Sequence, residues 1–378
     1  MKDTMRFALL QALMSLAALG VAAVAPAATA TATATPSAFQ DPLAAPAVRL
    51  SSPALLQQPV IALARVATGK TVRLVAAGLR GVILISDDGG AAWHQARVPV
   101  QSDLVSLDFT SSGQGWAVGH DGVILHSADR GDTWTLQFDG RAAQRTLLPY
   151  YQARIDHGEK QLAPFAEQVA LNTKDGPTLP FLAVHFDDDR AGYAIGSFGM
   201  LVATDDGGKT WRPWLDHIDN PNFLNLNDIR EIAGDLYIAG EQGGVYRLDR
   251  AAQRFVAISP PYKGSFFRIA GNERFLLAVG LNGTAYRSND RGASWSPVET
   301  GAKSSLTSAA FSADGKTLLL TAEGGQLLYS TDDAQTFHAL RASRPMLFAD
   351  AVADGDNDDF VLAGYQGIGR QRVTEHQK

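Results

Sequence analysis

Short apolar runs separated by glycine turns recur along most of this 378-residue chain. In each unit an apolar stretch ends in a small residue and Gly, a tight turn carries a second Gly, and another short apolar stretch follows. This pattern is typical of a tight antiparallel hairpin, because glycine supplies the positive φ angles that such turns need. The three clearest copies span residues 77–84, 118–125 and 195–202, and four more begin at Gly240, Gly280, Ala322 and Gly364.

The spacing of these hairpins predicts the fold. Counted from the first glycine of each copy, or from Ala322 in the sixth, successive copies are 41, 77, 44, 40, 42 and 42 residues apart, so one interval is long and the others are nearly constant. A period of about 40–45 residues corresponds to one four-stranded blade. We therefore expect an all-β fold, a seven-bladed β-propeller formed by residues 47–378.

A second motif, the Asp-box turn, follows the hairpin in most units. It reads Ser/Thr-x-Asp-x-Gly-x-x-Trp, with weaker copies at Asp249 and Asp332. The Asp is expected to close the turn by accepting hydrogen bonds from backbone N–H groups two or three residues on, above the aromatic ring. Because repeated blades place these carboxylates far apart around the rim, we interpret them as structural, not catalytic or metal-binding. The structural residues are Asp88 and Trp93, Asp129 and Trp134, Asp206 and Trp211, and Asp290 and Trp295.

The seventh unit stops near Val373, after its third strand and without an Asp-box. An open blade edge is an aggregation site, so a propeller is expected to cover it. The segment 47–51 lies upstream of the first blade's inner strand. We therefore expect it to supply the missing outer strand, so that the propeller is closed by its N- and C-terminal strands in one blade.

The long interval contains an insertion at residues 139–180, between blades two and three. Apolar residues there recur at three- and four-residue steps, with charged residues between them. This periodicity favours two short helices interrupted near Asp156-His157-Gly158. Such an excursion is a frequent carrier of function, but the helix pair could equally cover a blade edge.

The N-terminal region indicates export. Lys2 and Arg6 precede an apolar run over residues 7–25, and Ala28-Thr29-Ala30 offers a small-x-small cleavage site. This pattern predicts a signal peptide over residues 1–30, a low-complexity linker over 31–46 and a periplasmic location. The alternative is a retained membrane anchor, which needs about 20 apolar residues.

Composition narrows the possible chemistry. The chain has no Cys, which removes disulfides, thiol nucleophiles and thiolate metal ligands together. Its formal net charge is −6 and it has no basic run, so we expect no nucleic-acid partner. No His pair at metal-protease spacing, nucleophile elbow or phosphate-cradling loop occurs, and we expect neither metal nor cofactor.

The innermost strands line the central channel of a propeller, so their side chains are the first candidates for a site. Aligning these strands on the last apolar residue brings mixed charges into one column. Two interpretations stay open, a protein- or ligand-binding pocket at the axis and a solvated wall whose charges satisfy one another. The column contains Arg65, Asp108, His185, Glu231, Arg268, Ala310 and Ala351, with Arg230 beside it.

The hairpin and Asp-box together resemble the bacterial neuraminidase-type repeat. Seven units after an exported N-terminus more closely resemble the photosystem II assembly/stability factor propeller family, over residues 47–373. The resemblance implies a non-catalytic protein that binds newly made membrane-complex subunits at the membrane surface. We also expect the chain to be monomeric. The long insertion and the ordinary periplasmic signal region depart from the family. The expected partners are therefore membrane-protein subunits, photosynthetic or not, or a membrane transporter complex.

The alternative function is a sialidase-like glycoside hydrolase, which shares the Asp-box. Sialidase-like enzymes share an arginine triad, a Tyr/Glu pair, an acidic Asp and a Phe/Tyr-Arg-Ile-Pro segment near the start. The nearest match here is Phe267-Arg268-Ile269-Ala270, which lacks the Pro and lies in blade five. Arg65, Arg230 and Arg268, with Glu231 nearby, would have to act as the triad. A shared fold does not carry a shared function.

Overall fold

The computed structural model describes residues 40–51, 55–68, 71–355 and 358–373, and within them finds seven antiparallel sheets. The first three sheets contain β1 (Val60–Thr68), β2 (Thr71–Gly78), β3 (Ile83–Ser86) and β4 (His94–Gln95); β5 (Leu104–Phe109), β6 (Gly115–Gly119), β7 (Ile124–Ser127) and β8 (Thr135–Phe138); β9 (Phe181–Phe186), β10 (Gly192–Gly196), β11 (Leu201–Thr204) and β12 (Arg212–Pro213). The next two contain β13 (Leu226–Ile232), β14 (Asp235–Gly240), β15 (Val245–Asp249) and β16 (Arg254–Ala257); β17 (Phe266–Asn272), β18 (Phe275–Gly280), β19 (Ala285–Ser288) and β20 (Ser296–Pro297). The last two contain β21 (Leu306–Phe311), β22 (Leu318–Ala322), β23 (Leu327–Ser330) and β24 (His338–Leu340); β25 (Phe348–Ala353), β26 (Asp359–Gly364) and β27 (Gly367–Arg372).

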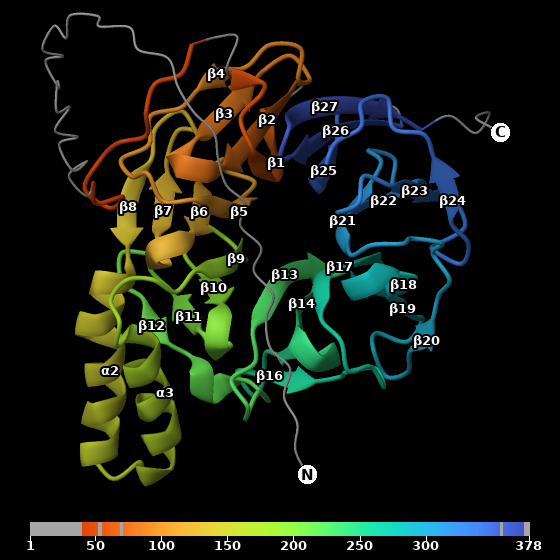
Figure 1. Ribbon diagram of the computed structural model, residues 1–378. Coiled ribbons are helices and arrows are strands. Elements are labelled where there is room, and N and C mark those ends of the chain that lie inside the picture. Colours follow the sequence, from red (N-terminus) through yellow and green to blue (C-terminus); the bar gives the residue numbers. More distant parts are fainter. Residues whose placement is uncertain (1–39, 52–54, 69–70, 356–357, 374–378) are drawn as a thin grey trace, which may run out of the picture. The chain divides into compact units, whose positions relative to one another are not determined.

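The sheets follow one another in sequence order around a common centre (Figure 1). Each innermost strand contacts the innermost strand of the next sheet, and β25 contacts β1. A separate apolar cluster fills each interface between neighbouring sheets, including the interface of the seventh sheet with the first, where Val361 and Ile368 pack with Val60 and Leu74. The fold is therefore propeller-like and modular, as the repeat predicts.

The inner hairpins form where the glycine pattern predicts them, and in the first sheet the two glycines of the turn act differently. In the first sheet, η1 (Leu79–Gly81) joins β2 to β3, and both Arg80 and Gly81 have positive φ angles, of 57° and 71°. This is the requirement of a type I′ turn. Gly78 is extended, but a Cβ there would lie 2.0 Å from the Pro59 carbonyl oxygen. The first glycine is thus required by a close backbone approach, and only the second by its φ.

The predicted fourth strand of the last sheet is wrong. Within the described residues this sheet has three strands, and residues 47–51 form none. They lie against the first sheet instead, where the Ala47 N–H donates to the Val98 carbonyl and Leu50 and Gln95 are hydrogen-bonded. The sequence analysis assigned this segment to the last sheet by elimination, because no local sequence pattern shows which sheet edge a distant strand joins.

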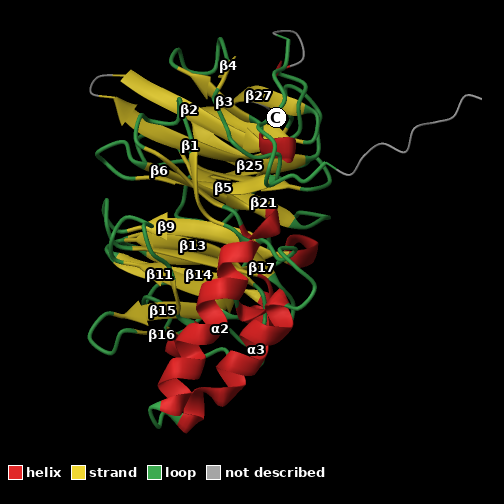
Figure 2. Cartoon of the chain, turned by 90° about the vertical axis from the view of Figure 1, so that its left-hand side faces the viewer, coloured by secondary structure: helices red, strands yellow, loops and turns green. Residues whose placement is uncertain are grey.

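The insertion between β8 and β9 is helical, as predicted. It contains α2 (Gly140–Asp156), a short 3-10 turn η3 (Lys160–Leu162) and α3 (Ala163–Thr173). Asp139 caps α2 by accepting from the Ala142 N–H at 2.7 Å, and α2 ends just before Gly158, whose φ is +109°. The two helices lie side by side outside the sheets (Figure 2).

The predicted signal peptide, residues 1–30, and most of the linker lie outside the described residues. Among the helices of the described chain, none is both long enough and apolar enough to cross a membrane.

Candidate functional site

A cavity of about 350 Å³ lies at the channel mouth where the innermost strands end. Five of the six charged candidates line it, and Ala310 and Ala351 line it too. The sixth, His185, lies beside Asp108 but does not line the cavity. The five lining candidates are Arg65, Asp108, Arg230, Glu231 and Arg268.

The strand alignment that predicted this cluster of charged residues is nevertheless wrong in register. Each innermost strand begins with a residue paired to the small residue that ends the second strand, and a β-bulge follows at once. Counted from that residue, Asp108, His185 and Arg230 are equivalent, at the fifth position. Arg65 lies one residue later and Arg268 two residues earlier. The bulge adds one residue on one side of the pair, which an alignment on apolar residues does not detect.

Two buried carboxylates, which the sequence analysis missed, pair with Arg268 in the channel wall, at a level that we call the neck. Asp228 and Asp350 occupy the third position of their strands, as Arg268 does. Arg268 contacts both, with its guanidinium 3.4 Å from Asp228 and 3.0 Å from Asp350. Arg230 adds a bond of 3.1 Å from its Nε to Asp228. An alignment on the small residue that faces each strand start, a glycine or Ala322, would have found Asp228, Arg268, Ser308 and Asp350 at one level in four successive sheets.

These carboxylates also join neighbouring sheets through the backbone. Asp228 accepts the Ile269 N–H at 3.0 Å, and Asp350 accepts the Leu63 N–H at 3.0 Å. Asp108 uses the same device, accepting the Phe186 N–H at 2.7 Å. Because buried charges are tolerated when they are paired and hydrogen-bonded, this network favours the interpretation of a self-satisfied wall for the deep part of the channel.

His185 is the centre of a second charged group. Its Nδ1 lies 3.4 Å from Asp108 and its Nε2 lies 3.2 Å from Asp187, which also pairs with Arg250 at 2.9 Å. Burial alone would favour the neutral ring, but hydrogen bonds and charge attraction from the two carboxylates raise the pKa of His185 to about 9. The imidazole is therefore protonated at neutral pH.

The same group has the spacing of a metal site, but its side chains are engaged in ion pairs. Ligand atoms of His185, Asp187 and Glu231 lie within 4.8 Å of one another. Both ring nitrogens of His185, however, face carboxylates. Arg250 also occupies the Asp187 carboxylate with two hydrogen bonds. The arrangement supports ion pairing rather than metal binding.

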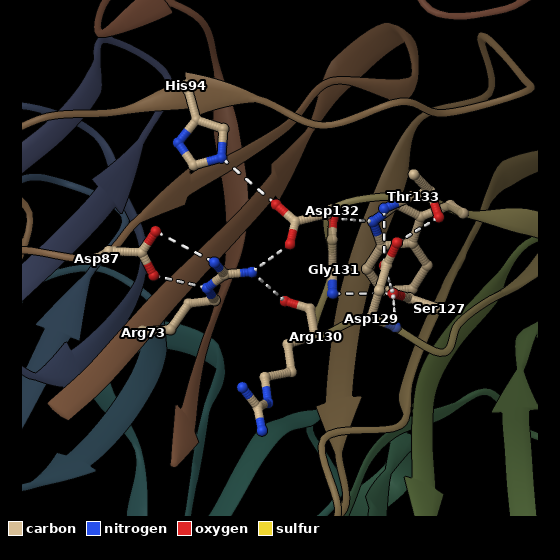
Figure 3. Close-up of polar contacts among 10 residues, drawn as sticks. Arg73, Asp87, His94, Ser127, Asp129, Arg130, Gly131, Asp132 and Thr133 are labelled. Carbon is tan, nitrogen blue, oxygen red and sulfur yellow. Dashed lines mark hydrogen bonds and ion pairs between the residues drawn. The ribbon is translucent and has the colours of Figure 1, made fainter. Parts of the chain in front are cut away.

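The Asp-box carboxylates close their own turns. Asp129 accepts from the Thr133 N–H at 2.8 Å and from the Ser127 hydroxyl at 2.8 Å, while the Gly131 N–H donates to that hydroxyl (Figure 3). At Asp129 the N–H comes from four residues on instead of the expected two or three, whereas the weaker copies Asp249 and Asp332 do accept an N–H from two or three residues on. The sequence analysis gave no role to the preceding Ser or Thr. Its hydroxyl donates to the Asp carboxylate and accepts the N–H of the Gly. The Trp134 indole then donates to the Gly131 carbonyl at 2.8 Å.

The other copies show how much of the motif is needed. The carboxylates of Asp88, Asp206, Asp290 and the weaker copy Asp332 make the same contacts. Asp249 lacks the preceding hydroxyl and closes a shorter turn through the Ala251 and Ala252 N–H groups. Trp93 donates to Gly90, Trp295 donates to Ile258, and Trp211 has no acceptor for its buried indole N–H among the described residues.

An arginine next to one Asp-box ties two sheets together. Arg73 of the first sheet contacts Asp87 of its own sheet and Asp132 of the second sheet, each at 2.7 Å (Figure 3). Comparable pairs link other neighbouring sheets, such as Arg291 with Asp235. The rim thus carries charged contacts between sheets, which is a structural use of these side chains.

The helical insertion covers the outer edge of the third sheet. Leu147 and Tyr151 of α2 are fully buried in a cluster that includes Trp211 and Leu215. The Tyr151 hydroxyl donates to Asp216 at 2.7 Å. Of the two interpretations left open for the insertion, this packing supports the covering role.

The cavity does not have the arrangement that a sialidase-like reaction needs. Arg268 is paired with Asp228 and Asp350, and Arg230 with Asp228, so neither guanidinium is free to hold a substrate carboxylate. No Tyr is among the described residues that line this cavity.

The fold and the repeated turn define the class of protein, a propeller-like protein built from Asp-box repeats. Residues 66–141 match the family model described as photosynthesis system II assembly factor YCF48. The chain is 27% identical over 235 residues to the chloroplastic photosystem II stability/assembly factor HCF136 of Cyanidioschyzon merolae, covering 58% of this chain and 51% of that protein. It is 23% identical over 220 residues to the photosystem II assembly lipoprotein Ycf48 of Synechococcus sp. (strain CC9902), covering 54% of each.

A solved structure of YCF48 bound to D1 peptide superimposes with a TM-score of 0.61 and 14% identity, covering 88% of this chain and all of that one. At this identity the superposition shows the fold alone. The alignments with the two curated relatives span only about half of their lengths. The chain is a distant homologue of the photosystem II assembly factors Ycf48 and HCF136, and the family resemblance seen in the sequence is confirmed.

Proposed function

We propose that this chain is an exported, non-catalytic protein that binds a segment of a membrane-complex subunit at the charged channel mouth and so aids assembly of that complex. The observation that carries the proposal is the distant homology to proteins named assembly factors. A related structure holds a peptide of a photosystem II subunit, which supports a polypeptide as the ligand. The partner is a membrane-protein subunit or a membrane transporter complex.

The exposed part of the cavity rim is the proposed contact surface. Arg65 and Glu231 are exposed and line the cavity. Arg268, in contrast, is only 15% exposed and holds two buried carboxylates. A partner would meet the rim residues first, while Arg268 keeps the wall intact. The N-terminal export signal and the monomeric state are part of the same proposal.

Site-specific photocrosslinking tests this function. A photoreactive amino acid replaces Glu231 in the full-length chain, expressed in the cells that make it, and adducts are identified by mass spectrometry. Glu299, exposed in the segment between β20 and β21, provides the matched control position. We expect an adduct with an integral membrane protein at position 231 and none at 299, and a weaker adduct in an Arg65→Glu background.

The outcomes separate the alternatives. Adducts at both positions in equal yield, or none at position 231, would overturn binding at the channel mouth. Turnover of a sialoside or another glycoside by the purified chain would overturn the non-catalytic function.

A further inference from the structure

A second cavity, of about 310 Å³, lies at the opposite mouth of the channel, where the innermost strands begin. The bulge residue of each innermost strand contributes to its wall, so seven equivalent positions form a ring. Five of the seven are apolar, namely Ile61, Val105, Leu182, Phe267 and Ala349. We call this ring the bulge ring.

The two polar members of the bulge ring are already satisfied. The Asn227 amide donates to the Phe266 carbonyl at 2.7 Å, and the Thr307 hydroxyl donates to the Phe348 carbonyl at 3.1 Å. Their polar groups therefore face the next sheet. This wall is apolar in character, in contrast to the charged wall of the first mouth.

Exposed apolar side chains continue the surface away from the bulge ring. Tyr365 lines the cavity and is 53% exposed, and its N–H donates to the carbonyl of Leu347, which is 45% exposed. The Leu56 carbonyl, in a residue 42% exposed, accepts from the Ile368 N–H of β27. Three exposed apolar residues therefore lie on segments that are hydrogen-bonded to one another, and apolar residues gathered on a surface are typical of an interaction site.

One charged group at this mouth has no ion pair. The exposed Glu323 carboxylate lines the cavity and makes no ion pair within the described chain. A positively charged group of an occupant could therefore pair with it at the rim.

The wall and rim of the cavity define the chemistry of the occupant. The bulge ring offers apolar contacts, and the exposed Glu323 carboxylate at the rim favours a positively charged group. A polypeptide segment can carry an apolar and a positively charged side chain next to each other.

We propose that the bulge ring docks a polypeptide segment. The segment inserts one aromatic or branched aliphatic side chain among Ile61, Val105 and Phe267 and places a Lys or Arg against Glu323. This site lies at the mouth opposite to the proposed subunit-binding surface. It goes beyond the proposed function, and each can fail without the other.

Methyl NMR of the full-length chain tests the site directly. The probe is the acetylated, amidated hexapeptide GSKFSG, titrated against protein with labelled Ile, Leu and Val methyl groups. We expect saturable shifts of the Ile61, Val105 and Leu182 methyl resonances. Ile232 and Val352, which line the first cavity, serve as internal controls and should not move. We expect GSKASG to bind at least tenfold more weakly and GSEFSG severalfold more weakly.

A matched pair of cavity-filling variants completes the test. Ala349→Trp fills the bulge ring and should abolish the shifts, whereas Ala310→Trp fills the first cavity and should leave them. Equal shifts with GSKFSG and GSKASG would overturn the proposal even if a variant fails to fold. Shifts with a laurate probe but not with GSKFSG would also overturn it, because the occupant would then be an acyl chain.

Discussion

The Arg268 guanidinium lies 3.0 Å from the Asp350 carboxylate and so joins the innermost strands of the fifth and seventh sheets, which are not neighbours. Asp350 also accepts the Ser308 hydroxyl of the sixth sheet at 2.6 Å and the Leu63 N–H of the first sheet. One carboxylate thus holds four sheets together at the neck of the channel. We therefore expect the loss of the Asp350 carboxylate to destabilise the whole fold.

We expect Arg268→Met to destabilise the protein by about 3–5 kcal/mol, because it leaves Asp350 buried without its cation and Asp228 with Arg230 alone. Arg230→Met is the control: its side chain is 40% exposed and makes one such pair, so we expect a loss of about 1 kcal/mol. Urea denaturation followed by tryptophan fluorescence measures both. Equal losses for the two variants would show that Arg268 does not hold the neck.

Stability should depend on pH through His185. A folded-state pKa of about 9, above the ordinary value of 6.5, means that its contribution is fully present below pH 6.5. It is then lost as the pH rises through about 9, and its upper bound is about 3 kcal/mol. We expect the melting temperature of the wild type to fall across this window and that of His185→Gln to change little. Parallel pH profiles for the two proteins would rule out His185 as the group responsible.

The features that sequence could predict are those that one unit encodes by itself. The turn at Arg80-Gly81 and the clasp at Asp129 are built from residues a few positions apart, so their spacing revealed the sheets and their number. Even there the role of Ser127 was missed, because its hydroxyl acts as both donor and acceptor in a turn ascribed to the Asp alone.

The errors concern contacts between units. The bulge at the start of each innermost strand shifts the register, so Asp228 and Asp350 were overlooked while Ala351 was included. Residues 47–51 pair with the first sheet because Gln95 bonds their backbone, which no repeat pattern records. Long-range placement depends on which surfaces meet, and a single sequence contains little of that information.

Loss of an Asp-box carboxylate should weaken the fold modestly and locally. Asp129→Ala removes hydrogen bonds from Ser127 and from both the N–H and the hydroxyl of Thr133, and we expect a loss of about 1 kcal/mol because the turn is solvated. Asp249→Ala, in the turn that lacks the hydroxyl, should cost less. Thermal unfolding compares the two variants. Loss of crosslinking at position 231 in a folded Asp129→Ala protein would instead give the carboxylate a functional role.

The helical insertion should contribute stability through its buried face. Leu147 is fully buried against the third sheet, whereas Leu171 on α3 is 65% exposed. We expect Leu147→Ala to cost about 2–5 kcal/mol and Leu171→Ser to cost almost nothing. Chemical denaturation of the two variants measures the difference. Similar small losses would mean that the helices are only loosely attached to the sheet.

The same packing determines how a binding role of the insertion has to be tested. Deleting residues 140–175 would uncover Trp211 and Leu215 and leave Asp216 without Tyr151 and Arg154, so lost partner recovery would report unfolding as readily as lost contact. We expect this deletion to raise binding of a hydrophobic dye and to lower the melting temperature. Reversing the exposed charge of Glu167 instead keeps the buried face intact, and we expect unchanged stability and unchanged crosslinking at position 231. Reduced crosslinking in a stable Glu167→Arg protein would show that the insertion contacts the partner as well as covering the sheet.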